Sequence, residues 1–515
     1  MTATRPAVSA VGFRSERGPV LAAVMLSTGL VALDSTIIAT AVPSVVRDLG
    51  GFAQFPWLFS VYLLTQAVTV PLYGKFADLL GRRPVMFLGI GIFLLGSVLC
   101  GFAWSMPALI VFRALQGIGA GAIQPMSLTI VGDLYTVEER ARVQGYLASV
   151  WGVASVLGPT LGGVFSQYLS WRWIFFVNLP LGAVAVWVLH RHFHEQVNRR
   201  RHSIDYRGAF LLTTGLSLVI LGLLEGGVSW GWASKQSVLI FGLGAVLLGT
   251  FIRVEQRAVE PVLPLWVFAR RTLVGGNLAS LAVGALTIGL TLYVPTFVQG
   301  VLGTGALVAG FALAVLTVGW PIAATLSGRI YIRIGFRDTA LIGSGIVVVG
   351  TILCAMLPQH THVLDVAGAC FVVGLGLGLS ASPSMVAVQS VVGWDRRGVV
   401  TGTNMFCRSL GSAVGAAVFG AIANATLADR FRHPPAALAG QLPKSVDATN
   451  LVLGRGASNP AGPSGTARQS EVVAFVRGAL YDASHHVFLA LVVVGLLVGA
   501  ALLLMPRHTE QLSFD

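Results

Sequence analysis

The chain has 515 residues, of which 55% are hydrophobic and only 11% are charged. A soluble domain carries about a quarter charged residues, so this composition excludes a water-soluble enzyme and indicates an all-α membrane protein. The net charge of +13 would suit a nucleic-acid-binding surface only if it were gathered on one, and it follows the pattern of membrane topology instead.

Apolar stretches separated by turns or charged clusters predict fourteen transmembrane helices, since about 20 apolar residues cross the hydrocarbon core and lipid offers the backbone no partner. We place them at residues 19–42, 56–74, 85–103, 107–131, 142–166, 171–189, 207–224, 236–252, 273–297, 305–328, 339–357, 364–388, 399–425 and 486–505. The four cysteines all fall inside these spans, which argues against a disulfide framework or a metal site.

The positive charges predict the orientation of these helices. Of the 34 Lys and Arg residues, 23 lie in the N-terminus, the even-numbered loops and the C-terminus, whereas only Arg47, Arg172 and Lys235 lie in short odd-numbered loops. Because cytoplasmic loops are rich in Lys and Arg, both termini are expected in the cytoplasm. The 31 arginines against 3 lysines hint at a GC-rich bacterial genome, and hence at a bacterial inner membrane.

Two segments outside the helices are long. Residues 426–485 are expected to lie outside the cytoplasm, as the predicted orientation requires. They are expected to form a flexible loop, because their centre, 454–469, is rich in Gly, Pro, Ser and Ala. Residues 190–207 form a basic cytoplasmic loop. Three alternating histidines there are too weak a pattern to predict a metal site.

The sequence also repeats itself. GIGAG at 117–121 matches GLGLG at 374–378, and GKFADLLGRR at 74–83 matches GRIYIRIGFR at 328–337. The two offsets, 257 and 254 residues, are nearly equal. Repeated halves that rock about a central site are typical of transporters.

The repeat predicts three parts. We expect a six-helix half at 1–190, a linker with two inserted helices at 191–271, and a second six-helix half at 272–515.

Four motifs carry a family resemblance. They are LDSTIIATAVP (33–43), GKFADLLGRRP (74–84), FRALQGIGAG (112–121) and GVASVLGPTLGG (152–163). In this order and in these helices, they resemble the fourteen-helix drug:proton antiporters of the major facilitator superfamily. The resemblance implies the major facilitator fold, alternating access and export of small molecules.

Asp34 and Arg113 are the candidate coupling residues. Asp34 lies about 15 residues into the first helix, so about 22 Å deep, where a carboxylate is costly unless it faces water or a partner. It could take up and release a proton, although an Asp held by helix hydroxyls for packing alone is the alternative. Arg113 stays protonated and could control that carboxylate. The resemblance implies a role in proton transfer for this arginine.

Polar residues near these charges are candidates for a substrate cavity. Gln116 and Gln124 share a helical face with Arg113, and Asn404 and Arg408 share one in the thirteenth helix. Arg408 could line the cavity as an alternative partner for Asp34 or extend toward the cytoplasm, and the sequence leaves the two possibilities open.

Two motifs suggest moving parts. The loop with Gly74, Asp78, Gly81, Arg82 and Arg83 is a candidate gate, because Asp78 could meet an arginine or a helix N-terminus in one conformation only. The resemblance implies that role; a merely solvated loop charge is the alternative.

Gly158, Pro159 and Gly162 form a GxxxG step with a proline between the glycines. We expect a bend at the interface between the halves. The resemblance associates this motif with exporters, which favours antiport over uptake.

The chain has no GxxxxGK[ST] loop, so ATP is not expected to drive it, and no nucleophile elbow or metal-ligand set suggests an enzyme. We therefore expect proton-coupled export of amphiphilic or cationic compounds across the lipid bilayer, a multidrug efflux activity associated with antibiotic resistance. It would need no cofactor beyond the proton gradient and no nucleic acid. The alternatives are an exporter of a lipid or endogenous metabolite and, less favoured, a non-transporting sensor.

Overall fold

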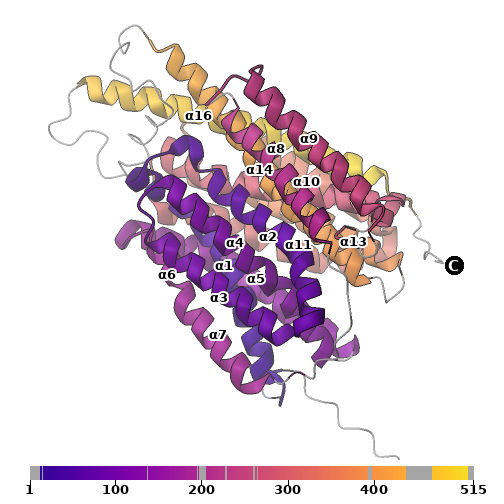
Figure 1. The fold of residues 1–515 in the computed structure, drawn as a ribbon. Helices are drawn as coiled ribbons and strands as arrows, with labels where there is room; N and C mark the ends of the chain where they lie inside the picture. Colours follow the sequence, from indigo (N-terminus) through magenta and orange to yellow (C-terminus); the bar gives the residue numbers. More distant parts are fainter. Residues whose placement is uncertain are drawn as a thin grey trace, which may run out of the picture.

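The computed structural model describes residues 12–13, 15–135, 137–193, 195, 205–226, 229–258, 261–263, 265–392, 397–435 and 467–507. These residues are almost entirely helical, and their only strand-like feature is an isolated bridge between Gly226 and Trp230. The predicted all-α class is therefore confirmed (Figure 1).

The helices follow the predicted order. The first half holds α1 (Gly18–Leu49), α2 (Trp57–Leu80), α3 (Arg82–Gly101), α4 (Met106–Leu134), α5 (Val137–Tyr168) and a broken sixth span made of α6 (Trp173–Phe176) and α7 (Asn178–His192). The inserted pair is α8 (Tyr206–Glu225) and α9 (Lys235–Glu255). The second half holds α10 (Arg271–Thr296), α11 (Ala306–Ile334), α12 (Phe336–Ala355), α13 (Val363–Ser390), α14 (Arg397–Arg432) and α16 (Ala467–Leu503).

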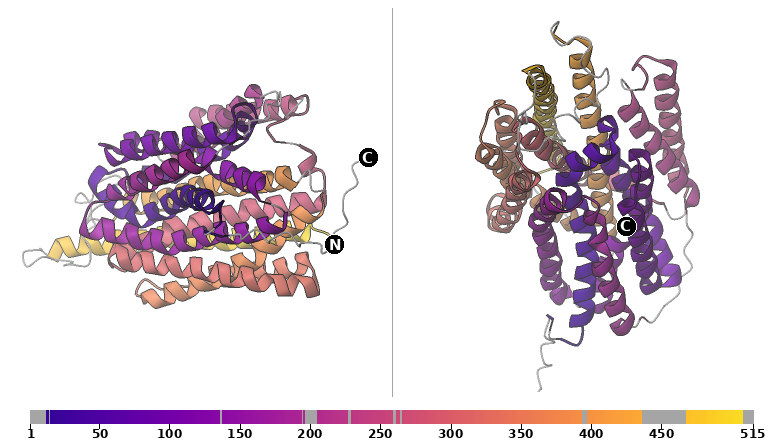
Figure 2. Two further views of the ribbon diagram at one scale, coloured as in Figure 1. Left: turned by 90° about the horizontal axis from the view of Figure 1, so that it is seen from below. Right: turned by 90° about the vertical axis from the view of Figure 1, so that its left-hand side faces the viewer.

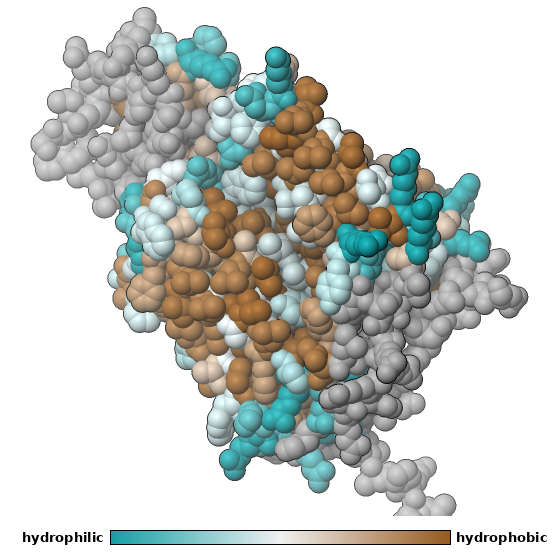
Figure 3. Space-filling model, in the orientation of Figure 1, coloured by the Kyte–Doolittle hydropathy of each residue, from teal (hydrophilic) through white to brown (hydrophobic). Residues whose placement is uncertain are grey.

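Thirteen spans in the described part are long and apolar enough to cross a membrane. α2 occupies the second position of the expected fourteen and carries Thr65, Gln66 and Thr69 among its apolar residues. Figure 3 shows apolar side chains along the flanks of the helices and hydrophilic ones gathered near their ends. This distribution suits a chain surrounded by lipid.

Three boundaries differ from those expected. α2 continues past residue 74 to Leu80, so Asp78 lies in its last helical turn and not in a loop. The sixth span breaks at Val177. The expected loop 426–485 is helical at both ends, because α14 runs to Arg432 and α16 begins at Ala467.

Helix packing repeats between the halves. α1 packs on α5 and α3 on α4 in the first half, just as α10 packs on α14 and α12 on α13 in the second (Figures 1 and 2). The joint between α2 and α3 is Gly81, with φ 99° and ψ 158°, and the joint between α11 and α12 is Gly335, with φ 89° and ψ 163°. Positive φ favours glycine, which explains why this position is glycine in both copies of the repeated motif.

The halves meet at one end of the bundle. Ser60 Oγ of α2 donates to the Ala413 carbonyl of α14 (3.1 Å), and Asn424 Nδ2 of α14 donates to the Ala53 carbonyl (2.9 Å). Gln299 Nε2, just after α10, donates to the Thr40 carbonyl of α1 (3.2 Å). We call this the sealed end.

Glycines complete the sealed end. A Cβ on Gly163 of α5 would lie 2.7 Å from Leu307 Cα of α11, and one on Gly310 would lie 2.4 Å from the Pro159 carbonyl oxygen. The inserted pair stands beside this interface, where Trp57 Nε1 donates to Glu225 Oε1 of α8 (3.1 Å).

Candidate functional site

A buried ion pair joins α1 and α4 within the first half. Arg113 Nη1 lies 2.6 Å from Asp34 Oδ2, and each side chain is 1% exposed. A lone buried carboxylate at this place would be costly. The arginine compensates that charge.

Two amide side chains complete the coordination of the carboxylate. Gln116 Nε2 donates to Asp34 Oδ1 (2.8 Å), and Asn178 Nδ2 donates to the same oxygen (3.2 Å). Both also donate to Ser97 Oγ of α3, at 2.7 and 3.2 Å. We call Asp34, Ser97, Arg113, Gln116 and Asn178 the polar cluster. All of its contacts to Asp34 are donors, which suits a carboxylate that only accepts.

Helix α2 and the glutamine fix the guanidinium from the other sides. Its carbon lies 4.0 Å from the centroid of the Tyr62 ring, Nε donates to the Leu58 carbonyl (3.3 Å), and Nη1 donates to Gln116 Oε1 (2.6 Å). Arginine is well suited to such a place, because its planar group stacks on aromatic faces and its donors form a rigid fork.

In this arrangement the buried cation of Arg113 depends on the charge of Asp34. If Asp34 lost its charge, Arg113 would keep the Tyr62 ring, the Gln116 amide oxygen and the Leu58 carbonyl, but it would be a buried cation without a counter-ion. Removing one partner of a buried pair is strongly destabilising. The charge state of Asp34 therefore bears directly on the stability of this conformation.

Two residues expected in a substrate cavity lie elsewhere. Gln116 is fully buried and belongs to the polar cluster. Asn404 is 2% exposed and ties α14 to α10, accepting from Ser280 Oγ (2.7 Å) and donating to the Gly276 carbonyl (3.1 Å). In this conformation other helices cover both side chains, because helical periodicity gives the face of a helix but not the neighbour that covers it; their cavity role stays a prediction.

Gln124 and Arg408 remain candidates for the cavity. Both side chains are partly exposed, and neither side chain has a hydrogen bond or ion pair with another described residue. Gln124 lies two turns beyond Gln116 on α4. Arg408 lies one turn beyond Asn404 on α14, where its backbone carbonyl accepts from Ser412 Oγ (3.1 Å).

The candidate gating loop is held by the linker. Glu195 accepts from the backbone amides of Arg82 (2.8 Å) and Arg83 (2.9 Å), so its carboxylate caps the N-terminus of α3. Arg83 Nη2 donates to the His190 carbonyl at the end of α7 (2.8 Å). The side chain of Asp78 and the surroundings of Gly74 lie outside the described part.

The GxxxG step lies in a different contact from the one expected. A Cβ on Gly158 would lie 2.0 Å from Thr36 Oγ1, and one on Gly162 would lie 2.3 Å from the Ile37 carbonyl oxygen. Both glycines therefore pack α5 on α1 inside the first half. Only Pro159, through its carbonyl, faces α11 of the other half, so the prediction that all three lie between the halves was wrong.

Little in the sequence indicates a role for Ser97, Asn178 or Tyr62 at this site. Asn178 stands at the break in the sixth span, two residues before Pro180. Proline suits the first turn of a helix and not its interior, so this proline could have marked the break and placed an asparagine inside the membrane. Ser97 and Tyr62 are ordinary residues of apolar helices and have no such signal.

Comparisons with known proteins agree with this architecture. Residues 24–416 match the profile of the Major Facilitator Superfamily. The multidrug transporter protein MdtP of Bacillus subtilis (strain 168) is 33% identical over 494 residues, covering 93% of this chain and 91% of the relative. Multidrug resistance protein 3 of the same organism is 34% identical over 403 residues, covering 78% and 79%.

A solved structure shares the fold. It is a bacterial homolog of the human lysosomal transporter Spinster, in an inward-facing and unoccupied conformation. It aligns with a TM-score of 0.68 and 17% identity, covering 96% of this chain and 98% of that one.

Proposed function

Because this chain belongs to the major facilitator superfamily and is a multi-pass membrane transporter, not an enzyme, we propose that it exports amphiphilic or cationic small molecules in exchange for protons. The names of two relatives, a multidrug transporter and a multidrug resistance protein, support the substrate class. Export by alternating access across a bacterial inner membrane, with both termini in the cytoplasm, is part of the proposal.

The observation that carries proton coupling is the enclosure of the Asp34–Arg113 pair. Asp34 is the carboxylate of the polar cluster, and Arg113 cannot give up its proton, so Asp34 is the group able to carry one. In this conformation both side chains are 1% exposed. Exchange with water therefore requires the helices around the cluster to rearrange, which links protonation to conformation.

The sealed end supports alternating access. Its hydrogen bonds, glycine approaches and apolar packing, such as Phe55 on Tyr293, join elements of different halves, so the halves could separate there without either being disrupted. The polar cluster lies wholly inside the first half and moves with it. Neutralising Asp34 would weaken this conformation and favour the rearranged one.

Purified protein in sealed liposomes tests the proposal. An inward-directed or outward-directed pH gradient is imposed, and uptake of the cationic dye ethidium is compared with that of a radiolabelled phospholipid and of an anionic metabolite. We expect ethidium transport only when the imposed gradient drives protons in the direction opposite to that of ethidium. Transport of phospholipid or metabolite alone would support the alternative substrate class, and gradient-independent flux would contradict proton coupling.

A further inference from the structure

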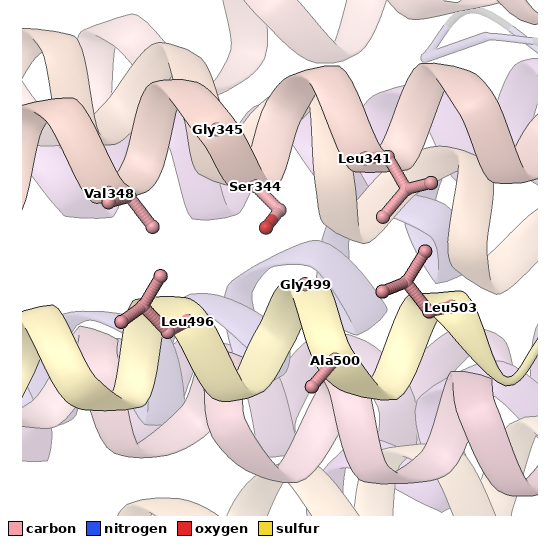
Figure 4. A pocket seen from close by; sticks show the side chains of 8 residues that line it. All are labelled: Leu341, Ser344, Gly345, Val348, Leu496, Gly499, Ala500 and Leu503. Atoms are coloured by element: carbon pink, nitrogen blue, oxygen red, sulfur yellow. The ribbon is translucent and has the colours of Figure 1, made fainter.

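A groove runs between α12 and α16 on the second half. It has a volume of about 440 Å³, and Leu341, Gly345 and Val348 of α12 face Leu496, Gly499 and Leu503 of α16 across it (Figure 4). From Leu341 to Val348 it extends about 10 Å along the helix. That is most of one leaflet of a ~30 Å hydrocarbon core.

The floor of the groove is made by small residues. A Cβ on Gly499 would lie 2.8 Å from Ser344 Oγ, so the helices touch there, whereas a Cβ on Gly345 would meet nothing within 4 Å. The groove is therefore open above Gly345, and its lining is apolar apart from Ser344. It suits an acyl chain.

Two arginines lie beyond one end of the groove: Arg337 precedes Leu341 by four residues, one helical turn, and Arg507 follows Leu503 by four. The chain turns at Gly335 just before α12, and Arg507 passes beside this turn, since a Cβ on Gly335 would lie 3.8 Å from the Arg507 carbonyl oxygen. Arg337 follows in the first turn of α12. Its Nε is buried without a hydrogen-bond partner, and no ion pair joins Arg337 or Arg507 to another described residue.

The first half shows which groups bind at the counterpart position, the N-terminus of α3. Arg83 is the counterpart of Arg337 in the repeated motif, 254 residues earlier. There, Glu195 accepts from the first two amides of α3, and the His190 carbonyl accepts from the Arg83 guanidinium. In the second half no side chain among the described residues caps α12, so the equivalent amides and guanidinium lack their anion.

We propose that this groove binds one anionic phospholipid, with its phosphate at the N-terminus of α12 beside Arg337 and an acyl chain between α12 and α16. A helix N-terminus and a nearby arginine both favour an anion. Basic pockets between transmembrane helices on the cytoplasmic side bind anionic headgroups, and this is the side on which the charge pattern places Arg337. Asp338 follows Arg337 in the sequence, and its negative charge would repel an anionic headgroup. Neutralising Asp338 should therefore strengthen lipid binding, whereas neutralising Arg337 should weaken it.

Native mass spectrometry of the full-length protein in mild detergent tests the site. The protein is titrated with phosphatidylglycerol and, separately, with phosphatidylethanolamine of the same chains. We expect one preferred phosphatidylglycerol per chain. Arg337→Gln should weaken its binding about tenfold, as for one lost charge-assisted contact, and Gly345→Leu should displace it by filling the groove, whereas Asp338→Asn should strengthen it.

The repeat supplies matched controls. Arg83→Gln and Gly91→Leu make the same changes at the counterpart positions, and a Cβ on Gly91 also meets nothing within 4 Å. Both should bind phosphatidylglycerol as the parent does. Equal binding of the two lipids, or unchanged binding in both Arg337→Gln and Gly345→Leu, overturns the proposal. The proposal would also be overturned if the parent formed a dimer that Gly345→Leu dissociates, because a second copy of the chain would then occupy the groove.

Discussion

Asn178 reaches the carboxylate of Asp34 from the break between α6 and α7, with Nδ2 3.2 Å from Oδ1. It is the only member of the polar cluster contributed by the sixth span. Asn178 is the first residue of α7, two residues before Pro180. The cluster therefore joins α1, α3, α4 and α7 through side chains that no single motif contains.

Changing Asn178→Ala should weaken coupling without abolishing it. The variant removes one of three donors to Asp34, and a hydrogen bond to a charged group contributes about 1.5–3 kcal/mol. We expect proton-driven ethidium transport to fall about tenfold, measured as the initial rate in liposomes. Asn404→Ala is the control, because Asn404 is an equally buried amide in the other half; an equal fall in that variant would assign the effect to stability alone.

The close contact between α5 and α1 should not tolerate a side chain at Gly162. A Cβ there would lie 2.3 Å from the Ile37 carbonyl oxygen and 2.3 Å from Thr40 Oγ1. Overpacking typically costs about 1–3 kcal/mol, so Gly162→Ala should lower the thermal unfolding midpoint. Gly152→Ala on the same helix meets nothing within 4 Å and should leave it unchanged; the reverse order would contradict the packing described here.

Glu195 should stabilise the joint before α3. Its two oxygens accept from the amides of Arg82 and Arg83, and loss of a helix N-cap costs about 1 kcal/mol. Glu195→Gln keeps one acceptor and should cost less than Glu195→Ala. Chemical unfolding in detergent measures both, and an unchanged midpoint for Glu195→Ala would show that the linker does not hold the gating loop.

The distribution of arginines predicts the membrane orientation, which can be tested at exposed positions in the part of the chain that the structure describes. A cysteine replacing His433, after α14, should react with a membrane-impermeant thiol reagent in intact cells, whereas one replacing His192, at the end of α7, should react only after lysis. The four native cysteines are buried and give little background. The opposite labelling pattern would invert the topology.

The sequence alone predicted the helices, their order and the repeat, because the length of an apolar stretch and the glycines at positions 81 and 335 are local features of the chain. It also named Asp34 and Arg113 as the candidate coupling residues, with Arg408 as an alternative partner for Asp34; the structure pairs Asp34 with Arg113. The roles of Gln124, Arg408 and Asp78 stay predictions.

What the sequence did not predict depends on neighbours. The face of a helix is visible in its period, but the helix that covers that face is not. The sequence therefore did not show that Gln116 meets Asp34, that Asn404 meets α10 or that Gly158 packs on α1. Ser97 and Asn178 contribute single polar atoms, which become significant only when four helices bring them to one carboxylate.

The most direct test of the central claim is substrate-induced proton release from the purified protein in weakly buffered detergent. Ethidium is added, and the pH change is followed for the parent, for Asp34→Asn and for Asp48→Asn. Asp48 is a suitable control, because it lies on the same helix and also pairs with an arginine, Arg172, at 2.6 Å, but with its side chain 47% exposed. The account predicts release from the parent and from Asp48→Asn, and none from Asp34→Asn. Release from Asp34→Asn equal to that of the parent would place the coupling site elsewhere and contradict the account.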